Sequence, residues 1–140
     1  MEYNLERFIK AQNRDYPIAL SEIRDGYKRS HWIWYIFPQL KQLGRSSLAQ
    51  YYGIDSIDEA KAYLLHPVLR ARLEEICEAL LKLDSGDPYR IMGNIDGMKL
   101  RSSMTLFSEA AGRNSIFDRV LLKYYDGKKD DLTIKLLNIK

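Results

Sequence analysis

The residues most able to do chemistry lie in one stretch, from Lys28 to Gln39, which reads Lys-Arg-Ser-His-Trp-Ile-Trp-Tyr-Ile-Phe-Pro-Gln. His31 titrates near neutral pH and can act as an acid, a base or a hydrogen-bond donor. The ring of Trp34 or Tyr35 can stack on a base or a nicotinamide, and the ammonium of Lys28 can neutralise a phosphate. The stretch therefore contains the parts of a nucleotide-like site.

The same aromatic residues have two other interpretations. They can be core, with Trp32 and Phe37 buried and His31 bonded to a carbonyl group. Alternatively, the segment Trp32–Phe37 can be exposed as the hot spot of a protein–protein interaction or adaptor module without catalytic activity, which would leave a tryptophan in a broad apolar patch. The three interpretations differ in the burial that they predict for the tryptophans.

A second polar constellation begins at Asp96 and reads Asp-Gly-Met-Lys-Leu-Arg-Ser-Ser-Met-Thr. At about 100° per residue, Lys99, Ser102 and Ser103 share one face of a helix. A cation and two hydroxyl groups one turn apart form an anion-binding surface, and Asp96 can cap the helix or place a carboxylate near Lys99. The serines can instead bond back to carbonyl groups one turn earlier in the helix.

Other chemistry finds little support in the sequence. His66 precedes a proline at a predicted helix start, which is typical of a structural boundary residue. Neither histidine has a second ligand at metal-binding spacing, so we expect no metal site. No phosphate loop, dinucleotide turn or nucleophile elbow occurs, and no cofactor is predicted. Cys77 lies among apolar residues at helical spacing, where a thiol stays protonated and is a poor nucleophile.

Composition favours an ordinary globular protein. The chain has 140 residues, of which 46% are hydrophobic and 29% charged, with a formal net charge of +3. These values argue against disorder, and the mild charge falls short of the basic footprint of duplex nucleic-acid binders. No apolar run approaches the roughly 20 residues that span a bilayer. A single cysteine and the absence of an apolar signal core near the N-terminus predict a cytoplasmic location.

Apolar residues recur at helical spacing along the whole chain, and strand signals are weak. Caps and stops divide the pattern into pieces. The predicted helices are a first one after Asn4, one over 16–23 before Gly26, a short one over 31–37, one over 47–52, one after Ser56, one from Pro67, one turn from Pro88, a long one marked by Leu100, Met104, Phe107 and Ala111 and ending at Gly112, one after Ser115 and a last one after Asp130 or Asp131. We therefore expect one all-α domain over residues 1–140, with about seven to nine short helices.

The chain also resembles the DUF1810 domain family. The motifs that carry the resemblance are 31–39 with Leu43-Gly44, Tyr52-Gly53-Ile54, Glu59-Ala60, Tyr63-Leu64, His66-Pro67-x-Leu69, Arg72-Leu73, and Asp96 with Lys99-Leu100 and 102–107. The resemblance implies a compact all-helical fold and supplies no reaction. Some relatives are labelled calpastatin, but that inhibitor is disordered and repetitive, and this chain shows neither property.

The family's pattern includes a polar set in both constellations. It comprises Lys28, His31, Gln39, Asp96, Lys99, Ser102 and Ser103. We expect the two segments to meet and form one pocket for a small anionic ligand that bears phosphate, of the nucleotide or NAD/ADP-ribose type, with Trp34 also in contact. In an enzyme, His31 would act as acid or base and Lys99 as electrostatic stabiliser. A sensor would use the same pocket without turnover. The sequence indicates no membrane partner and no particular oligomeric state.

Overall fold

Helices form almost all of the regular structure in residues 3–138, the part of the chain that this computed structural model describes. Its elements are α1 (Glu6–Arg24), α2 (Ile33–Ile36), the 3-10 helix η1 (Lys41–Leu43), α3 (Ser47–Tyr52), α4 (Ile57–Leu65), α5 (Pro67–Lys82), α6 (Pro88–Met92), α7 (Asn94–Ala111), α8 (Ile116–Tyr125) and α9 (Asp131–Asn138). Within this range, extended pairing is limited to an isolated bridge between Leu40 and Ile54. The prediction of an all-α fold is confirmed.

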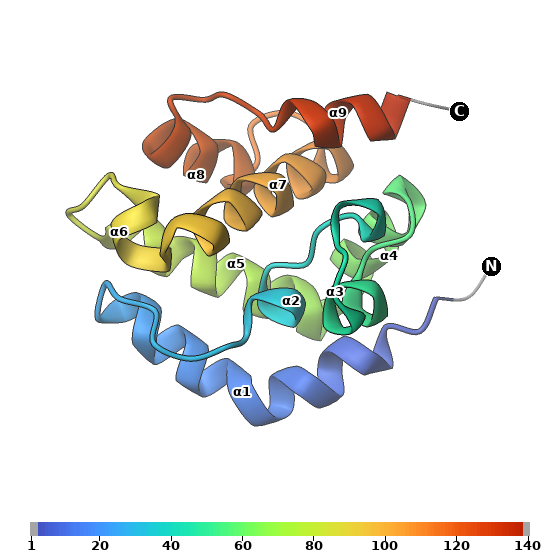
Figure 1. Cartoon of the computed structure of the whole chain (residues 1–140), viewed down its shortest axis with the longest axis horizontal. Coiled ribbons are helices and arrows are strands. Elements are labelled where there is room, and N and C mark those ends of the chain that lie inside the picture. The colour runs from blue at the N-terminus through green and yellow to red at the C-terminus, as the bar shows by residue number, and fades with distance from the viewer. Residues whose placement is uncertain (1–2, 139–140) are drawn as a thin grey trace.

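The long helices α5 and α7 lie at the centre of the molecule (Figure 1). Helix α5 contacts α1 and α8, and α7 contacts α4, α6, α8 and α9. The short helix α2 contacts α1, α3 and α7, so the aromatic stretch lies between the N-terminal helix and α7. One continuous cluster of buried apolar side chains joins these elements into a single domain. In the described part of the chain, no helix has the length and apolar character needed to cross a membrane.

Most helices begin at the predicted side-chain caps. The Ser56 hydroxyl accepts a hydrogen bond from the Glu59 amide at 3.2 Å, while the Glu59 carboxylate accepts one from the amide of Asp55 rather than from Ser56. The sequence Ser56-Ile57-Asp58-Glu59 has the pattern of a capping box, and only its forward half, from the Glu59 amide to Ser56, is formed. His66 accepts a hydrogen bond from the Val68 amide through Nδ1, which confirms its structural role. Further side-chain caps are Asp87, directly before Pro88, and Ser115 and Asp130, after which the sequence predicts helices.

Helix α1 joins two helical patterns that the sequence separates. The helix continues through Pro17. Leu5 directly precedes the first residue of the helix and makes no side-chain cap, so the cap predicted at Asn4 is not formed. A buried face from Phe8 to Ile23 packs against the core along the whole helix, and this burial outweighs the backbone hydrogen bond that a proline removes. The helix ends before Gly26, which has a φ of 78° and provides the predicted left-handed stop.

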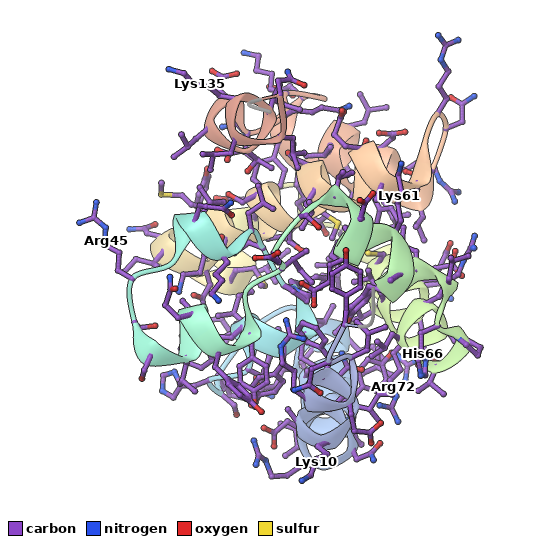
Figure 2. The ribbon with its side chains drawn as sticks, turned by 90° about the vertical axis from the view of Figure 1, so that its right-hand side faces the viewer. Lys10, Arg45, Lys61, His66, Arg72 and Lys135 are labelled. Atoms are coloured by element: carbon purple, nitrogen blue, oxygen red, sulfur yellow. The ribbon has the colours of Figure 1, made fainter. Side chains whose placement is uncertain are left out.

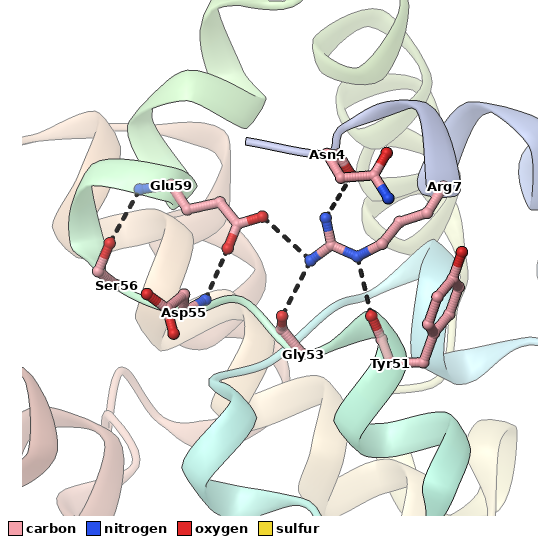
Figure 3. A network of polar contacts seen from close by, with 7 residues as sticks. All are labelled: Asn4, Arg7, Tyr51, Gly53, Asp55, Ser56 and Glu59. Atoms are coloured by element: carbon pink, nitrogen blue, oxygen red, sulfur yellow. Dashed lines mark hydrogen bonds and ion pairs between the residues drawn. The ribbon is translucent and has the colours of Figure 1, made fainter. Parts of the chain in front are cut away.

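A buried arginine ties the start of α1 to the segment between α3 and α4 (Figure 3). The guanidinium of Arg7 donates to the carbonyl groups of Tyr51 at 2.9 Å and Gly53 at 3.0 Å. It also forms an ion pair with Glu59 at 3.0 Å, and the two side chains are only 8% and 3% exposed. The second oxygen of that carboxylate accepts the Asp55 amide at 2.7 Å. The end of α3 and the connecting residues 53–55 are thus tied to α1 and α4 by charge-assisted hydrogen bonds.

The exposed cations do not gather on one face. Lys10, Arg45, Lys61 and Lys135 are exposed and lie on different sides of the molecule (Figure 2). Several other cations are neutralised, as in the ion pair of Lys129 with Glu109 at 2.5 Å. Clusters of three or more potential metal ligands do not occur within residues 3–138. These four cations therefore do not form a common basic surface.

Candidate functional site

The aromatic stretch is mainly core. Trp32 and Phe37 are each 1% exposed, and Tyr35 is 4% exposed. This confirms the interpretation of these rings as anchors of the fold, and it leaves no broad apolar patch over the segment Trp32–Phe37. Trp34 differs, because it is only partly buried and packs at the edge of the core. The side chain of Trp34 is therefore more exposed to solvent than that of Trp32.

Glu22 holds the start of this stretch in place. Its Oε1 accepts hydrogen bonds from the amides of Arg29 at 2.9 Å and Ser30 at 3.0 Å and from the indole of Trp32 at 2.9 Å. Its Oε2 accepts the Ser30 hydroxyl at 2.5 Å. Burial by itself would raise the pKa of Glu22, but these hydrogen bonds favour the charged form and lower the pKa to about 2. Glu22, which forms no ion pair within residues 3–138, thus fixes the loop that carries Lys28 and His31.

The two polar constellations meet through an ion pair. The ammonium of Lys28 lies 2.8 Å from the carboxylate of Asp96, which is in the first turn of α7. The same ammonium donates to the carbonyl of Ser30 and lies 4.8 Å from the ring centroid of Trp32. The Lys28 side chain is only 6% exposed. The charge of Lys28 is therefore committed to Asp96. In this arrangement Lys28 is not free to make the phosphate contact that the sequence suggests for it.

A structural role for Lys28 predicts a loss of stability. The substitution Lys28→Met keeps the apolar stem beside Trp32 but leaves Asp96 unpaired, and we expect the free energy of unfolding to fall by about 2 kcal/mol. Urea denaturation followed by circular dichroism measures this change. The double variant with Asp96→Asn should recover part of the loss, because no charge is then left unpaired. A neutral effect of Lys28→Met would return Lys28 to the list of candidate ligand-binding residues.

Lys99 retains a free charge. No acidic side chain within residues 3–138 forms an ion pair with it. Its ammonium lies 5.6 Å from the ring centroid of Trp34, a weak cation–π contact. Lys99 and Trp34 both line a small cavity of about 10 Å³, the inner cavity, together with Gln39. That volume is the space of about one water molecule.

A larger hollow, the outer groove, adjoins the inner cavity, because Gln39 and Lys99 line both. It has a volume of about 390 Å³. Its apolar walls come from η1, α6, α7 and α9 and comprise Leu43, Tyr89, Ile95, Met98 and Leu132. Two of these residues are unusually exposed for apolar side chains, Ile95 at 70% and Met98 at 63%. The groove thus presents apolar surface to solvent beside an unpaired cation.

The polar residues of the outer groove give it a small positive charge. Arg101 is held by hydrogen bonds from its guanidinium to the carbonyl groups of Lys128 and Lys129, each at 2.9 Å. Asp130 supplies one negative charge, and its carboxylate accepts hydrogen bonds from both the amide and the hydroxyl of Thr133. The charges of Lys99, Arg101 and Asp130 therefore leave about one unit of positive charge. This suits one anionic group rather than several.

The other predicted site residues lie outside these hollows or contribute little to them. His31 is exposed and lines neither the inner cavity nor the outer groove. Ser103 is completely buried, and its hydroxyl has no partner among the described residues. Ser102 lines the outer groove, but its hydroxyl donates to the Met98 carbonyl at 3.2 Å, the backbone bond that the sequence allows as its alternative. Lys99, which lines both hollows, is therefore the predicted site residue best placed to bind an anion.

Comparison with known proteins identifies the family. Residues 2–137 match the family model described as "Protein of unknown function (DUF1810)". The chain belongs to the DUF1810 family. The resemblance drawn from the motifs between His31 and Phe107 is therefore confirmed. No curated protein matches the chain.

A solved structure extends the comparison to the fold of the DUF1810 domain. The crystal structure of the conserved hypothetical protein Rv1873 from Mycobacterium tuberculosis has 43% sequence identity to this chain and a TM-score of 0.95. The match covers 99% of each chain. The helical arrangement in Figure 1 is therefore an arrangement that an experimentally determined protein also adopts.

Sequence reasoning missed the apolar walls of the outer groove in this DUF1810 domain. Ile95 and Met98 lie one turn apart on α7, but off the buried stripe that contains Leu100 and Met104. Apolar residues placed outside the buried stripe of an amphipathic helix are a signal for a binding surface, and this signal was available in the sequence. The contributions of Tyr89 and the other wall residues depend on tertiary contacts and had no local signal.

Proposed function

We propose that this DUF1810 domain binds a small organic anion in the outer groove, with one phosphate or carboxylate group near Lys99 and an apolar or aromatic part against the groove walls. The observation that carries the proposal is the unpaired cation of Lys99 beside exposed apolar side chains in a hollow of about 390 Å³. Ligand sites typically combine such apolar walls with a few polar groups that fix orientation. A mononucleotide is the nucleotide-type ligand that fits best, because Lys28 is committed to Asp96.

The proposal is binding rather than catalysis. His31, the candidate acid or base, lines neither hollow, and Lys99 alone provides charge stabilisation without proton transfer. The adaptor function through Trp32–Phe37 is not proposed, because the burial of Trp32 and Phe37 leaves little surface for a partner. We place the function in the cytoplasm, which fits a single cysteine that is free and buried.

A thermal-shift screen with AMP, NAD, ADP-ribose, phenyl phosphate, benzoate and inorganic phosphate tests the proposal. We expect AMP or phenyl phosphate to raise the melting temperature, since a ligand that binds the folded state stabilises it. Lys99→Ala should weaken this binding about tenfold or more, because a charge-assisted hydrogen bond contributes about 1.5–3 kcal/mol. It should change stability by less than about 0.5 kcal/mol.

The matched control is Lys10→Ala. Lys10 is exposed on α1 and lines neither hollow, so this variant removes the same charge without touching the site. Binding should remain as in the unmodified protein. If no compound in the screen shifts the melting temperature, or if Lys99→Ala and Lys10→Ala bind equally well, the outer groove is not an anion site.

A further inference from the structure

The two tryptophans of the aromatic stretch differ in one respect that points to a ligand contact. The indole N–H of Trp32 donates to Glu22 at 2.9 Å. The indole N–H of Trp34 is also buried, yet it has no hydrogen-bond acceptor among the residues that the structure describes. The great majority of buried polar groups in native proteins are paired, and leaving a donor unpaired is unfavourable for folding. This N–H therefore calls for an explanation that the core does not supply.

None of the described residues around Trp34 accepts its indole proton. Besides Trp34, the inner cavity is lined by the cation of Lys99, the amide side chain of Gln39, the phenol side chain of Tyr52, and apolar or backbone groups that include Phe37 and Gly53. In the structure, the Gln39 side-chain carbonyl does not accept the indole proton, and Lys99 has no acceptor of its own in residues 3–138. Trp34, whose indole donor has no partner in residues 3–138, and the cation of Lys99 thus line the same small cavity.

We propose that the inner cavity is an anchoring subsite, in which one oxygen atom of the ligand's anionic group accepts a hydrogen bond from the Trp34 indole and is paired with the ammonium of Lys99. The cavity volume of about 10 Å³ fits one oxygen atom. Because Gln39 and Lys99 also line the outer groove, the rest of the ligand continues from this oxygen into the groove. The inference rests on the proposed function and adds the donor that fixes the orientation of the anionic group.

This arrangement selects for the chemistry of the bound group. An N–H donor and an ammonium both require a hydrogen-bond acceptor. A cationic ligand, or an apolar ligand without an oxygen acceptor, therefore leaves both groups unpaired. A phosphate monoester and a carboxylate both offer an anionic oxygen of suitable size. Phenyl phosphate and benzoate carry the same ring and differ in that group, so comparing them identifies which anionic group the subsite prefers.

The test follows the two indole N–H resonances of the ¹⁵N-labelled full chain in heteronuclear NMR spectra during a titration with phenyl phosphate. The chain contains only two tryptophans, so each resonance is assigned with Trp32→Phe and Trp34→Phe. We expect the Trp34 indole proton to move downfield as it gains an acceptor, in parallel with the saturation of the thermal shift. The Trp32 indole proton should not move, because Glu22 already accepts it.

Variants separate this role from a structural one. Trp34→Phe keeps an aromatic ring but removes the donor, and it should weaken phenyl phosphate binding about tenfold, as expected for loss of one charge-assisted hydrogen bond. Trp32→Phe should leave that affinity within about twofold while lowering the melting temperature, because the Glu22 carboxylate then loses a partner. The opposite pattern would mark Trp34 as part of the core only.

The possible failures are distinguishable. If phenyl phosphate shifts the methyl resonances of Met98 and Leu132 in the outer groove while the Trp34 indole stays fixed, the anchoring subsite is wrong and the proposed function stands. If the indole stays fixed and the groove resonances also fail to respond to phenyl phosphate, benzoate and AMP, both are wrong. An indole resonance that moves equally with phenol, which has the ring but no anionic group at neutral pH, would overturn the requirement for an anion.

Discussion

Replacing Glu22 with alanine should lower the free energy of unfolding by about 3–5 kcal/mol, because it breaks a buried hydrogen-bond network at its centre. The backbone amides of Arg29 and Ser30 and the indole of Trp32 would each lose their acceptor. A buried donor left without a partner is unfavourable by about 1–3 kcal/mol. Urea denaturation at neutral pH, followed by circular dichroism, measures the change. A loss below about 1 kcal/mol would show that the loop is held by other contacts.

The same network predicts how stability depends on pH. The pKa of Glu22 is about 2 in the folded protein, against an ordinary value of 4.5. Because the folded pKa is the lower one, the stabilisation is fully present above about pH 5 and is lost as pH falls toward 2. A difference of this size corresponds to about 3 kcal/mol. The control is Glu22→Gln, which has a similar size but does not titrate, so the stability difference between it and the unmodified protein should shrink as pH falls from 5 to 2.

Local signals were sufficient to predict the fold class and most helix boundaries. A cap such as Ser56 or His66 acts on amides two or three residues away, and its effect is therefore visible in the sequence itself. Helical spacing likewise predicted that Cys77 is buried, where desolvation raises the pKa of its thiol. The unbroken α1 shows where local signals fail, because burial of one continuous face decides the course of the chain through Pro17.

The candidate site was harder to predict, because its groups are assigned by contacts between distant parts of the chain. Lys28 has the residue type of a phosphate-binding group, but Asp96, far along the sequence, takes its charge. Lys99 has the same residue type and forms no ion pair in the part of the chain that the structure describes. Nothing local distinguishes the two lysines. The value of a cation for binding depends on whether the fold brings a carboxylate to it, and that information lies in the packing of α7 against the aromatic stretch.

Glu22 and Arg7 illustrate the same limit. Each occupies a position in α1 where a charged residue is usually solvated, and each is buried with several partners from later segments. Trp34 shows the converse, since an aromatic residue in an otherwise buried run keeps an unpaired donor at the edge of the core. Natural proteins depart from full satisfaction of buried groups mainly at functional or strained sites. The buried charges of Glu22 and Arg7 and the indole donor of Trp34 could be recognised only when the hydrogen-bond and ion-pair partners of each side chain were known.

An effect of similar size is expected for Arg7→Met, at another position remote from the outer groove. This change leaves the carboxylate of Glu59, which is 3% exposed, without its cation, and breaking a buried ion pair in this way lowers stability by about 3–5 kcal/mol. Arg7→Lys should restore only part of the loss, since an ammonium cannot reproduce the planar fork that donates to Tyr51, Gly53 and Glu59 together. Denaturation curves of the two variants test this order.

Arg7→Met should also weaken binding of phenyl phosphate, although Arg7 lines neither the inner cavity nor the outer groove. Gly53, whose carbonyl group accepts a hydrogen bond from Arg7, lines the inner cavity, so we expect the loss of this contact to loosen one wall of the cavity. The control is Arg14→Met, because Arg14 pairs with Asp15 at the surface with 69% of its side chain exposed and should change stability by less than about 1 kcal/mol. Affinity measured at a temperature where Arg7→Met is still folded separates the two effects. Unchanged affinity there would mean that Arg7 supports the fold without shaping the cavity.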